Sequence, residues 1–71
     1  MKEEAIEVEG LVTEALGAGR FRIQVDGSDH VPICKAGGKM SRFRIKITRG
    51  DRVRVELSPY DLTRGRIIYR L

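Results

Sequence analysis

The sequence has 71 residues and carries fourteen lysines and arginines against ten acidic residues, a net charge of +4. A chain of this length makes one domain with a thin apolar core. Because Cys34 is the single cysteine and His30 the single histidine, we expect no disulfide, no metal site and no cofactor. The lone thiol, the lack of a run of roughly 20 apolar residues and the lack of a signal-peptide core predict a cytoplasmic protein without a membrane partner.

Two strands are predicted in the first part of the chain. Residues 6–13 alternate apolar and polar side chains, which is the pattern of a half-buried strand. Gly10 occupies an inward position there, where a glycine suits a tight bend of a barrel. Residues 20–25 alternate again and predict a second strand between a glycine-rich turn and a hairpin loop at residues 26–29. The side chains expected inside are Ile6, Val8, Val12, Phe21, Ile23 and Val25.

The middle of the chain contains a third predicted strand and then a break in the pattern. Residues 30–34 predict the strand, with Val31 and Ile33 in phase. Pro32 indicates an edge position or a bulge, because proline has no amide hydrogen to donate. Two glycines follow, and residues 39–43 can form one helical turn.

The last part of the chain contains two more predicted strands. Residues 52–57 alternate cleanly and predict the first of them. Residues 58–65 predict a loop, opened by a proline and closed by a glycine, and residues 66–70 predict the last strand. The inward side chains are expected to be Val53, Val55, Leu57 and Tyr69.

The number and length of these elements predict an all-β fold. Five strands in 71 residues cannot make a useful two-layer sandwich, but they can close on themselves and so remove exposed edges. A short helical turn between the third and fourth strands is the arrangement of the OB-fold. We therefore predict a five-stranded OB-fold barrel as a single RNA-binding domain over residues 1–71. The alternative is an SH3-like barrel, which does not ordinarily need the break at residues 37–43.

The charges are distributed unevenly along the chain. Residues 1–34 have a charge balance of −4, and residues 35–71 have one of +8. This asymmetry predicts a polyanionic partner. Catalysis is not expected, because neither a nucleophile beside a base nor a paired set of carboxylates is recognisable. A protein–protein adaptor would leave the basic half unexplained.

The basic side chains point to RNA as the polyanion. Cations neutralise phosphates and release counterions, and a basic loop can enter the wide, shallow minor groove of an RNA helix. Met40 and Phe43 lie among these cations and have two interpretations, contacts with bases or plugs that close the barrel. Arg64, Arg66 and Arg70 either extend the patch or are solvated strand ends. The RNA-binding candidates are Lys35, Lys39, Met40, Arg42, Phe43, Arg44, Lys46, Arg49, Arg64 and Arg66.

Several stretches of the sequence resemble a known family. They are Gly38-Lys39-Met40, Gly50-Asp51-Arg52-Val53, Val55-Glu56-Leu57-Ser58-Pro59-Tyr60-Asp61-Leu62 and Arg64-Gly65-Arg66-Ile67. Together with Ile6-Glu7-Val8-Glu9-Gly10 and Phe21-Arg22-Ile23, they resemble bacterial translation initiation factor 1 over nearly the whole chain.

The resemblance implies an OB-fold protein that binds the aminoacyl-tRNA site of the small ribosomal subunit and assists initiation factors 2 and 3. It implies that residues 38–44 enter the minor groove of the decoding helix of 16S rRNA through Lys39 and Met40, followed by Arg42. Arg64 and Arg66 match basic family positions and are expected to face rRNA.

The chain departs from the family pattern at four positions around the same loop. The family usually has a histidine where this chain has Lys35, and a serine where it has Gly37. It has an arginine where this chain has Ser41, and an aromatic residue near Arg44. The total charge is therefore largely kept, but it is moved in position.

Two functions remain as hypotheses. The first is a monomeric initiation factor that binds the small ribosomal subunit and stabilises one rRNA conformation without chemistry. The alternative is a general RNA chaperone of cold-shock type, which would bind unstructured nucleic acid. The cluster of aromatic side chains typical of cold-shock domains is missing, which argues against the alternative.

Overall fold

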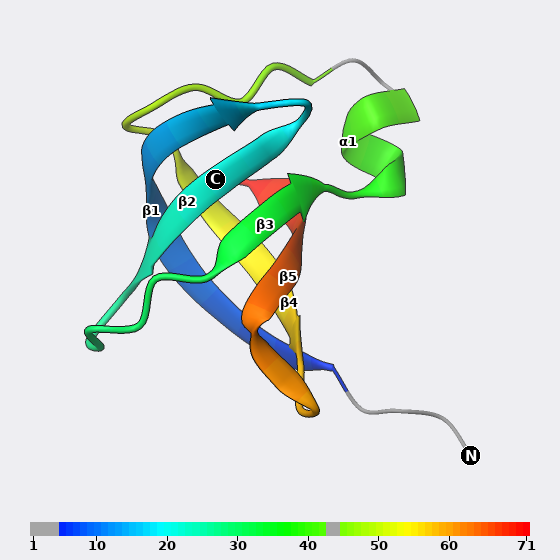
Figure 1. The fold of residues 1–71 in the computed structure, drawn as a ribbon. Helices are drawn as coiled ribbons and strands as arrows, with labels where there is room; N and C mark the ends of the chain where they lie inside the picture. The colour runs from blue at the N-terminus through cyan, green and yellow to red at the C-terminus, as the bar shows by residue number, and fades with distance from the viewer. Residues whose placement is uncertain (1–4, 43–44) are drawn as a thin grey trace.

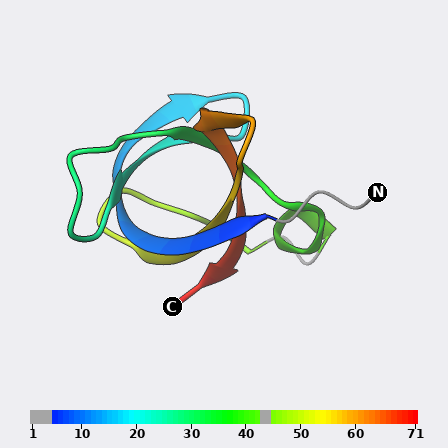
Figure 2. The same cartoon turned by 90° about the horizontal axis from the view of Figure 1, so that it is seen from below.

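The strands of the protein close into a barrel (Figures 1 and 2). This computed structural model describes residues 5–42 and 45–71, without the side chains of residues 39 and 41. The elements follow in the order β1 (Ile6–Gly17), β2 (Arg20–Val25), β3 (Ile33–Ala36), α1 (Gly38–Arg42), β4 (Arg52–Ser58) and β5 (Asp61–Arg70). In the barrel the strand order is β1-β2-β3-β5-β4. The predicted all-β, five-stranded closed barrel is confirmed, and it is consistent with an OB-fold.

The pairing pattern brings distant parts of the sequence together. Neighbouring strands are antiparallel, except that β3 and β5 run parallel and close the barrel. The short helix α1 lies beside the ring of strands, between β3 and β4 in the chain (Figure 2). Within the described ranges, no helix has the length and apolar character needed to cross a bilayer.

The alternating strands fill the barrel largely as expected, although Ile6, which was expected inside, is 41% exposed at the start of β1. Val12, Ile23, Val53, Val55 and Ile67 are all fully buried. Each such side chain stabilises the fold by about 1.5–3 kcal/mol relative to exposure. Cys34 also belongs to the core, and its burial raises the pKa of the thiol to about 11.

Gly10 shows why β1 needs a glycine at an inward position. A Cβ atom at Gly10 would lie 2.5 Å from the carbonyl oxygen of Gln24 and 2.8 Å from Cγ2 of Ile23. Both distances are far inside van der Waals contact. The strand can therefore cross β2 this closely only where the side chain is missing.

The third strand differs from the prediction in its start and in its phase. β3 begins at Ile33 rather than at residue 30, since Pro32 has no amide hydrogen for a ladder. Val31 and Ile33 are 37% and 38% exposed, whereas Pro32 and Cys34 are fully buried. The four residues from 31 to 34 are all apolar or nearly so, so their sequence carries no alternation that could set the phase.

The last strand also differs from the prediction. β5 begins at Asp61, and Ser58 pairs with Asp61, so the expected loop at residues 58–65 is only a tight turn. Tyr69 is 58% exposed instead of inward. Val55 pairs with Ile67 while Arg54 pairs with Tyr69, which leaves one extra residue on β5. This bulge reverses the phase of the strand after Ile67.

Candidate nucleic-acid interface

Three adjacent strands, β2, β3 and β5, carry a group of cations on their outer face. Arg20 of β2, Lys35 of β3 and Arg64 of β5 line an open groove of about 630 Å³. Ile33, Thr63 and Gly65 form the rest of its wall. The groove therefore combines positive charge, one hydroxyl and an apolar surface.

Strand register explains why these cations lie together. Arg20 is the partner of Lys35 across β2 and β3, and Lys35 is the partner of Arg66 across β3 and β5. Three cations thus stand in one row across three strands. Like charges directly opposite each other destabilise a sheet, so this row is unfavourable for folding and suits the binding of an anion.

Ion pairs separate these cations into two groups. Arg66 Nη2 lies 3.2 Å from Glu56 Oε1, and Arg22 Nη1 lies 3.2 Å from Glu14 Oε1. Within the described part of the chain, Arg20, Lys35 and Arg64 form no ion pair with a carboxylate. These three cations are therefore the ones whose charge is least compensated on this face.

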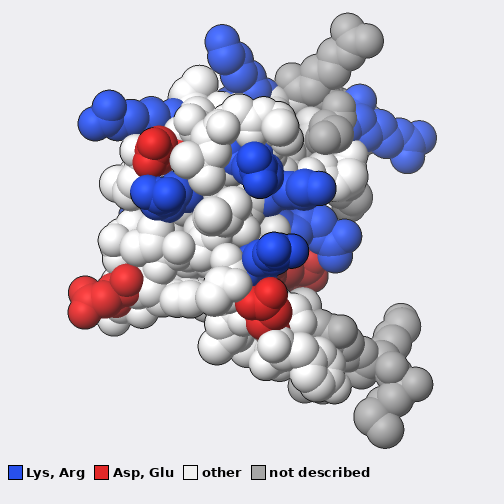
Figure 3. Space-filling model, in the orientation of Figure 1, with Lys and Arg blue, Asp and Glu red and all other residues white. Residues whose placement is uncertain are grey.

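Figure 3 shows the same distribution over the surface. Lysine and arginine side chains gather over the face formed by β2, β3 and β5 and around α1. Most acidic side chains visible in this view lie in its lower half, toward the end of the barrel that carries the β2–β3 loop, while another lies at the upper left beside basic side chains. The pKa of Asp61, at the β4–β5 turn, is held below its usual value by hydrogen bonds from the hydroxyl and amide of Thr63.

Three other predicted cations lie in α1 and in the segment that leads to β4. Arg42 is exposed at the end of α1, and Lys46 and Arg49 are exposed in the segment that leads to β4. Arg70 Nη1 donates a hydrogen bond to the carbonyl oxygen of Lys46 at 2.8 Å, which holds that segment against β5. Lys39 lies in α1, but its side chain, like Phe43 and Arg44, is outside the described residues.

Met40 has the role of a plug. Its side chain is 2% exposed and packs in the core cluster. Of the two interpretations of Met40, its burial favours the plug over the contact with bases, because a buried thioether has little surface to offer a ligand. The packing of Met40 attaches α1 to the barrel and leaves the exposed Arg42 at its rim.

Arg20 is the residue of this face that the sequence did not reveal. It lies in the acidic half of the chain, so a charge count by halves excludes it. The available signal was its outward phase in the predicted strand at residues 20–25. Only the pairing of β2 with β3 places it opposite Lys35.

The two side chains with catalytic potential have structural roles. Cys34 is buried in the core. His30 Nε2 donates a hydrogen bond to the carbonyl oxygen of Leu62 and so joins the β2–β3 loop to the start of β5. Among the described residues, no cluster of three or more His, Cys, Asp or Glu side chains could hold a metal ion. The arrangement as a whole can bind an anion.

Comparisons with known proteins identify the family of this chain and proteins that share its fold. The family model described as translation initiation factor 1A / IF-1 matches residues 1–71. The solution structure of translation initiation factor 1 from the Wolbachia endosymbiont strain TRS of Brugia malayi is 49% identical, with a TM-score of 0.77 over 94% of this chain and 78% of that chain. The crystal structure of YjeQ from Thermotoga maritima has the same TM-score of 0.77 at 23% identity, over 93% of this chain and 23% of that chain, and shows the fold alone.

Proposed function

Because this chain belongs to the translation initiation factor 1A / IF-1 family and is a translation initiation factor, we propose that it binds the aminoacyl-tRNA site of the small ribosomal subunit. In this proposal it acts in the cytoplasm as a monomeric OB-fold RNA-binding domain, contacts 16S rRNA and assists initiation factors 2 and 3. It works by binding alone.

The three cations Arg20, Lys35 and Arg64, which line the groove and form no ion pair with a described carboxylate, carry the proposal. Their mutual repulsion is relieved when phosphates approach, and the released counterions favour binding further. The groove, with the Thr63 hydroxyl and the apolar Ile33 beside two arginines and a lysine, suits the phosphate and sugar of a nucleotide.

The position of α1 supports a second contact. Met40 fixes the helix to the barrel, and the exposed Arg42 lies at the end of that helix. A short, basic, anchored element of this size fits the wide minor groove of an RNA helix. In the proposal, Lys39 and Arg42 contact the decoding helix there, and Arg64 and Arg66 contact the neighbouring rRNA.

The mechanism requires differential affinity. A ligand shifts an equilibrium between two rRNA conformations only by as much as it prefers one of them. The barrel strands position the cationic face, and the packing of Met40 positions α1, so together they fit one arrangement of phosphates better than another. Once bound, the protein sterically prevents a tRNA from entering the site, and it stabilises that rRNA conformation.

The experiment is the binding of the labelled protein to purified small ribosomal subunits over a salt series, with excess total RNA as competitor. Lys35→Ala combined with Arg64→Ala is expected to weaken binding and to lower the salt slope by about 2, roughly one per lost phosphate contact. Arg54→Gln, which removes one positive charge from the opposite side of the barrel, is the control and should bind as the wild type does.

Two results would contradict the proposal. One is wild-type affinity and salt slope in the folded double variant. The other is displacement of the wild-type protein by an unstructured single-stranded oligonucleotide, which would point to a general RNA chaperone instead.

A further inference from the structure

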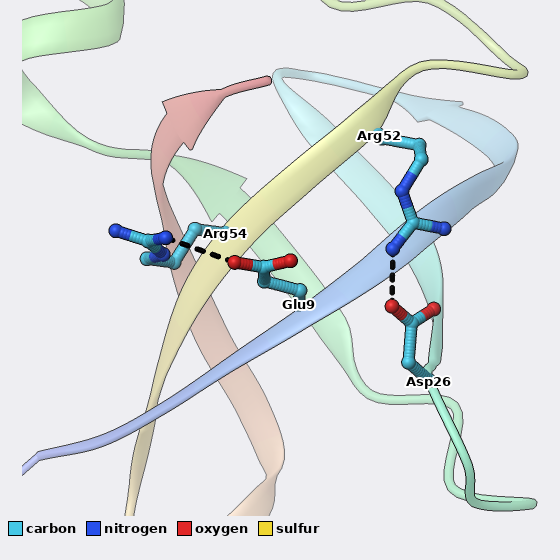
Figure 4. Close-up of polar contacts among 4 residues, drawn as sticks. All are labelled: Glu9, Asp26, Arg52 and Arg54. Carbon is cyan, nitrogen blue, oxygen red and sulfur yellow. Dashed lines mark hydrogen bonds and ion pairs between the residues drawn. The ribbon is translucent and has the colours of Figure 1, made fainter.

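Four charged side chains form two ion pairs across β1, β2 and β4 (Figure 4). Arg54 Nη2 donates to Glu9 Oε2 at 2.8 Å, and Arg52 Nη2 donates to Asp26 Oδ2. Glu9 and Arg54 are register partners on β1 and β4. Asp26 follows β2, and its amide donates to the carbonyl oxygen of Glu9 at 2.9 Å, which fixes it beside the same pair.

These pairs contribute little to stability. Their side chains are 42–48% exposed, and ion pairs that are this exposed to solvent and salt add little to the free energy of unfolding. Their larger effect is on charge. Each carboxylate comes from the acidic part of the chain and lies against an outward arginine of β4, and the hydrogen bonds raise the pKa of both guanidinium groups.

The two sides of the barrel therefore differ electrostatically, although both carry arginines. On the β2–β3–β5 face, Arg22 and Arg66 are paired with carboxylates, but Arg20, Lys35 and Arg64 form no ion pair with a described carboxylate. On the β1–β4 side, Arg52 and Arg54 are each neutralised by an adjacent carboxylate. A phosphate that approached Arg54 would also meet Glu9 within a few ångströms, so it would gain little attraction and release few counterions.

We propose that Glu9 and Asp26 are specificity-determining residues that neutralise Arg54 and Arg52 and so confine RNA to the β2–β3–β5 face. This inference rests on the proposed function, since it concerns how an RNA-binding barrel avoids binding RNA with the wrong side. Without the two carboxylates, the outward arginines of β4 form a second cationic surface. The protein then binds unrelated RNA more tightly.

The test compares binding to single-stranded polyuridylate with binding to small ribosomal subunits, both over a salt series. The variant is Glu9→Gln combined with Asp26→Asn, which keeps the size of each side chain and removes its charge. The double variant should bind polyuridylate several-fold more tightly than the wild type does. Its plot of log affinity against log salt concentration should be steeper by about 1.4, because two more phosphates are neutralised on a single strand. Affinity for small subunits should stay within twofold of the wild type.

A matched control separates local neutralisation from total charge. Asp29→Asn lies in the same loop as Asp26→Asn and changes the net charge equally, but Asp29 forms no ion pair with a described arginine. Asp26→Asn alone should tighten polyuridylate binding, and Asp29→Asn should change it much less. Adding Arg52→Gln and Arg54→Gln to the double variant should restore the wild-type value.

The outcomes distinguish the two proposals. Equal effects of Asp29→Asn and Asp26→Asn, or an unchanged polyuridylate slope in the double variant, would overturn the role of Glu9 and Asp26. Failure of the wild type to bind small subunits would instead overturn the proposed function, because the polyuridylate measurement does not depend on subunits. Thermal melts of each variant confirm that the comparison is between folded proteins.

Discussion

At the scale of single residues, the barrel depends on close approach as much as on apolar surface. A Cβ at Gly10 would lie 2.5 Å from a backbone oxygen, which cannot rotate away as a side chain can. At Gly38, by contrast, an added Cβ meets nothing within 4 Å. A side chain is therefore excluded at position 10 but has free space at position 38.

Gly10→Ala is expected to lower the free energy of unfolding by about 1–3 kcal/mol, the usual cost of overpacking. Gly38→Ala, as the matched control, should leave it unchanged or raise it by up to about 1 kcal/mol, because alanine favours helix over glycine. Denaturant unfolding followed by circular dichroism measures both. Equal stability of the two variants would contradict the close approach of β1 and β2.

At the scale of elements, α1 depends on the barrel rather than on its own sequence. A helix of five residues is too short to be stable alone in water. Its attachment comes from Met40, which is buried in the core cluster. The packing of one side chain therefore determines whether Arg42 stays beside the cationic face.

Met40→Ala is expected to release α1, because truncation of a buried methionine removes about 2–5 kcal/mol of stabilisation. Faster amide exchange in α1 and weaker binding to small subunits should follow, while the β strands keep most of their protection. Met40→Leu, which nearly preserves volume, should restore both properties. Normal subunit binding with a rapidly exchanging α1 would show that the helix makes no contact.

The elements also show what sequence alone could predict. The bounds of β2 and the burial along β4 were predicted correctly, because each strand has one face in the core and one in solvent. The phase of β3 and the inward position of Tyr69 were wrong, because one depends on a proline in an apolar run and the other on a bulge in β5. The groove between Arg20 and Arg64 could not be predicted, since it requires the parallel pairing of β3 with β5.

At the scale of the whole molecule, the distance over which salt screens charges is comparable to the size of the protein. The radius of gyration is 11.2 Å, and the Debye length is about 10 Å at 0.1 M salt. At that ionic strength the acidic end of the barrel is largely screened from the cationic face. A polyanion therefore meets one positive side, and the molecule is oriented before contact.

This orientation predicts a kinetic effect. The association rate constant with small subunits should fall steeply as salt rises, while the dissociation rate constant changes less. Lys35→Ala combined with Arg64→Ala should flatten the dependence of the association rate. Stopped-flow fluorescence over a salt series measures both constants, and an association rate insensitive to salt would contradict electrostatic steering.

The parallel pairing of β3 with β5 has a consequence for the order of folding. β1, β2 and β3 pair with their neighbours in the chain, whereas the second edge of β3 (Ile33–Ala36) must wait for β5 (Asp61–Arg70). Contacts between distant segments form late, since a long loop must first be closed. The wall of the groove that carries Arg64 is thus added last. During synthesis the emerging chain lacks this site, and it gains the complete groove only when its final strand has docked.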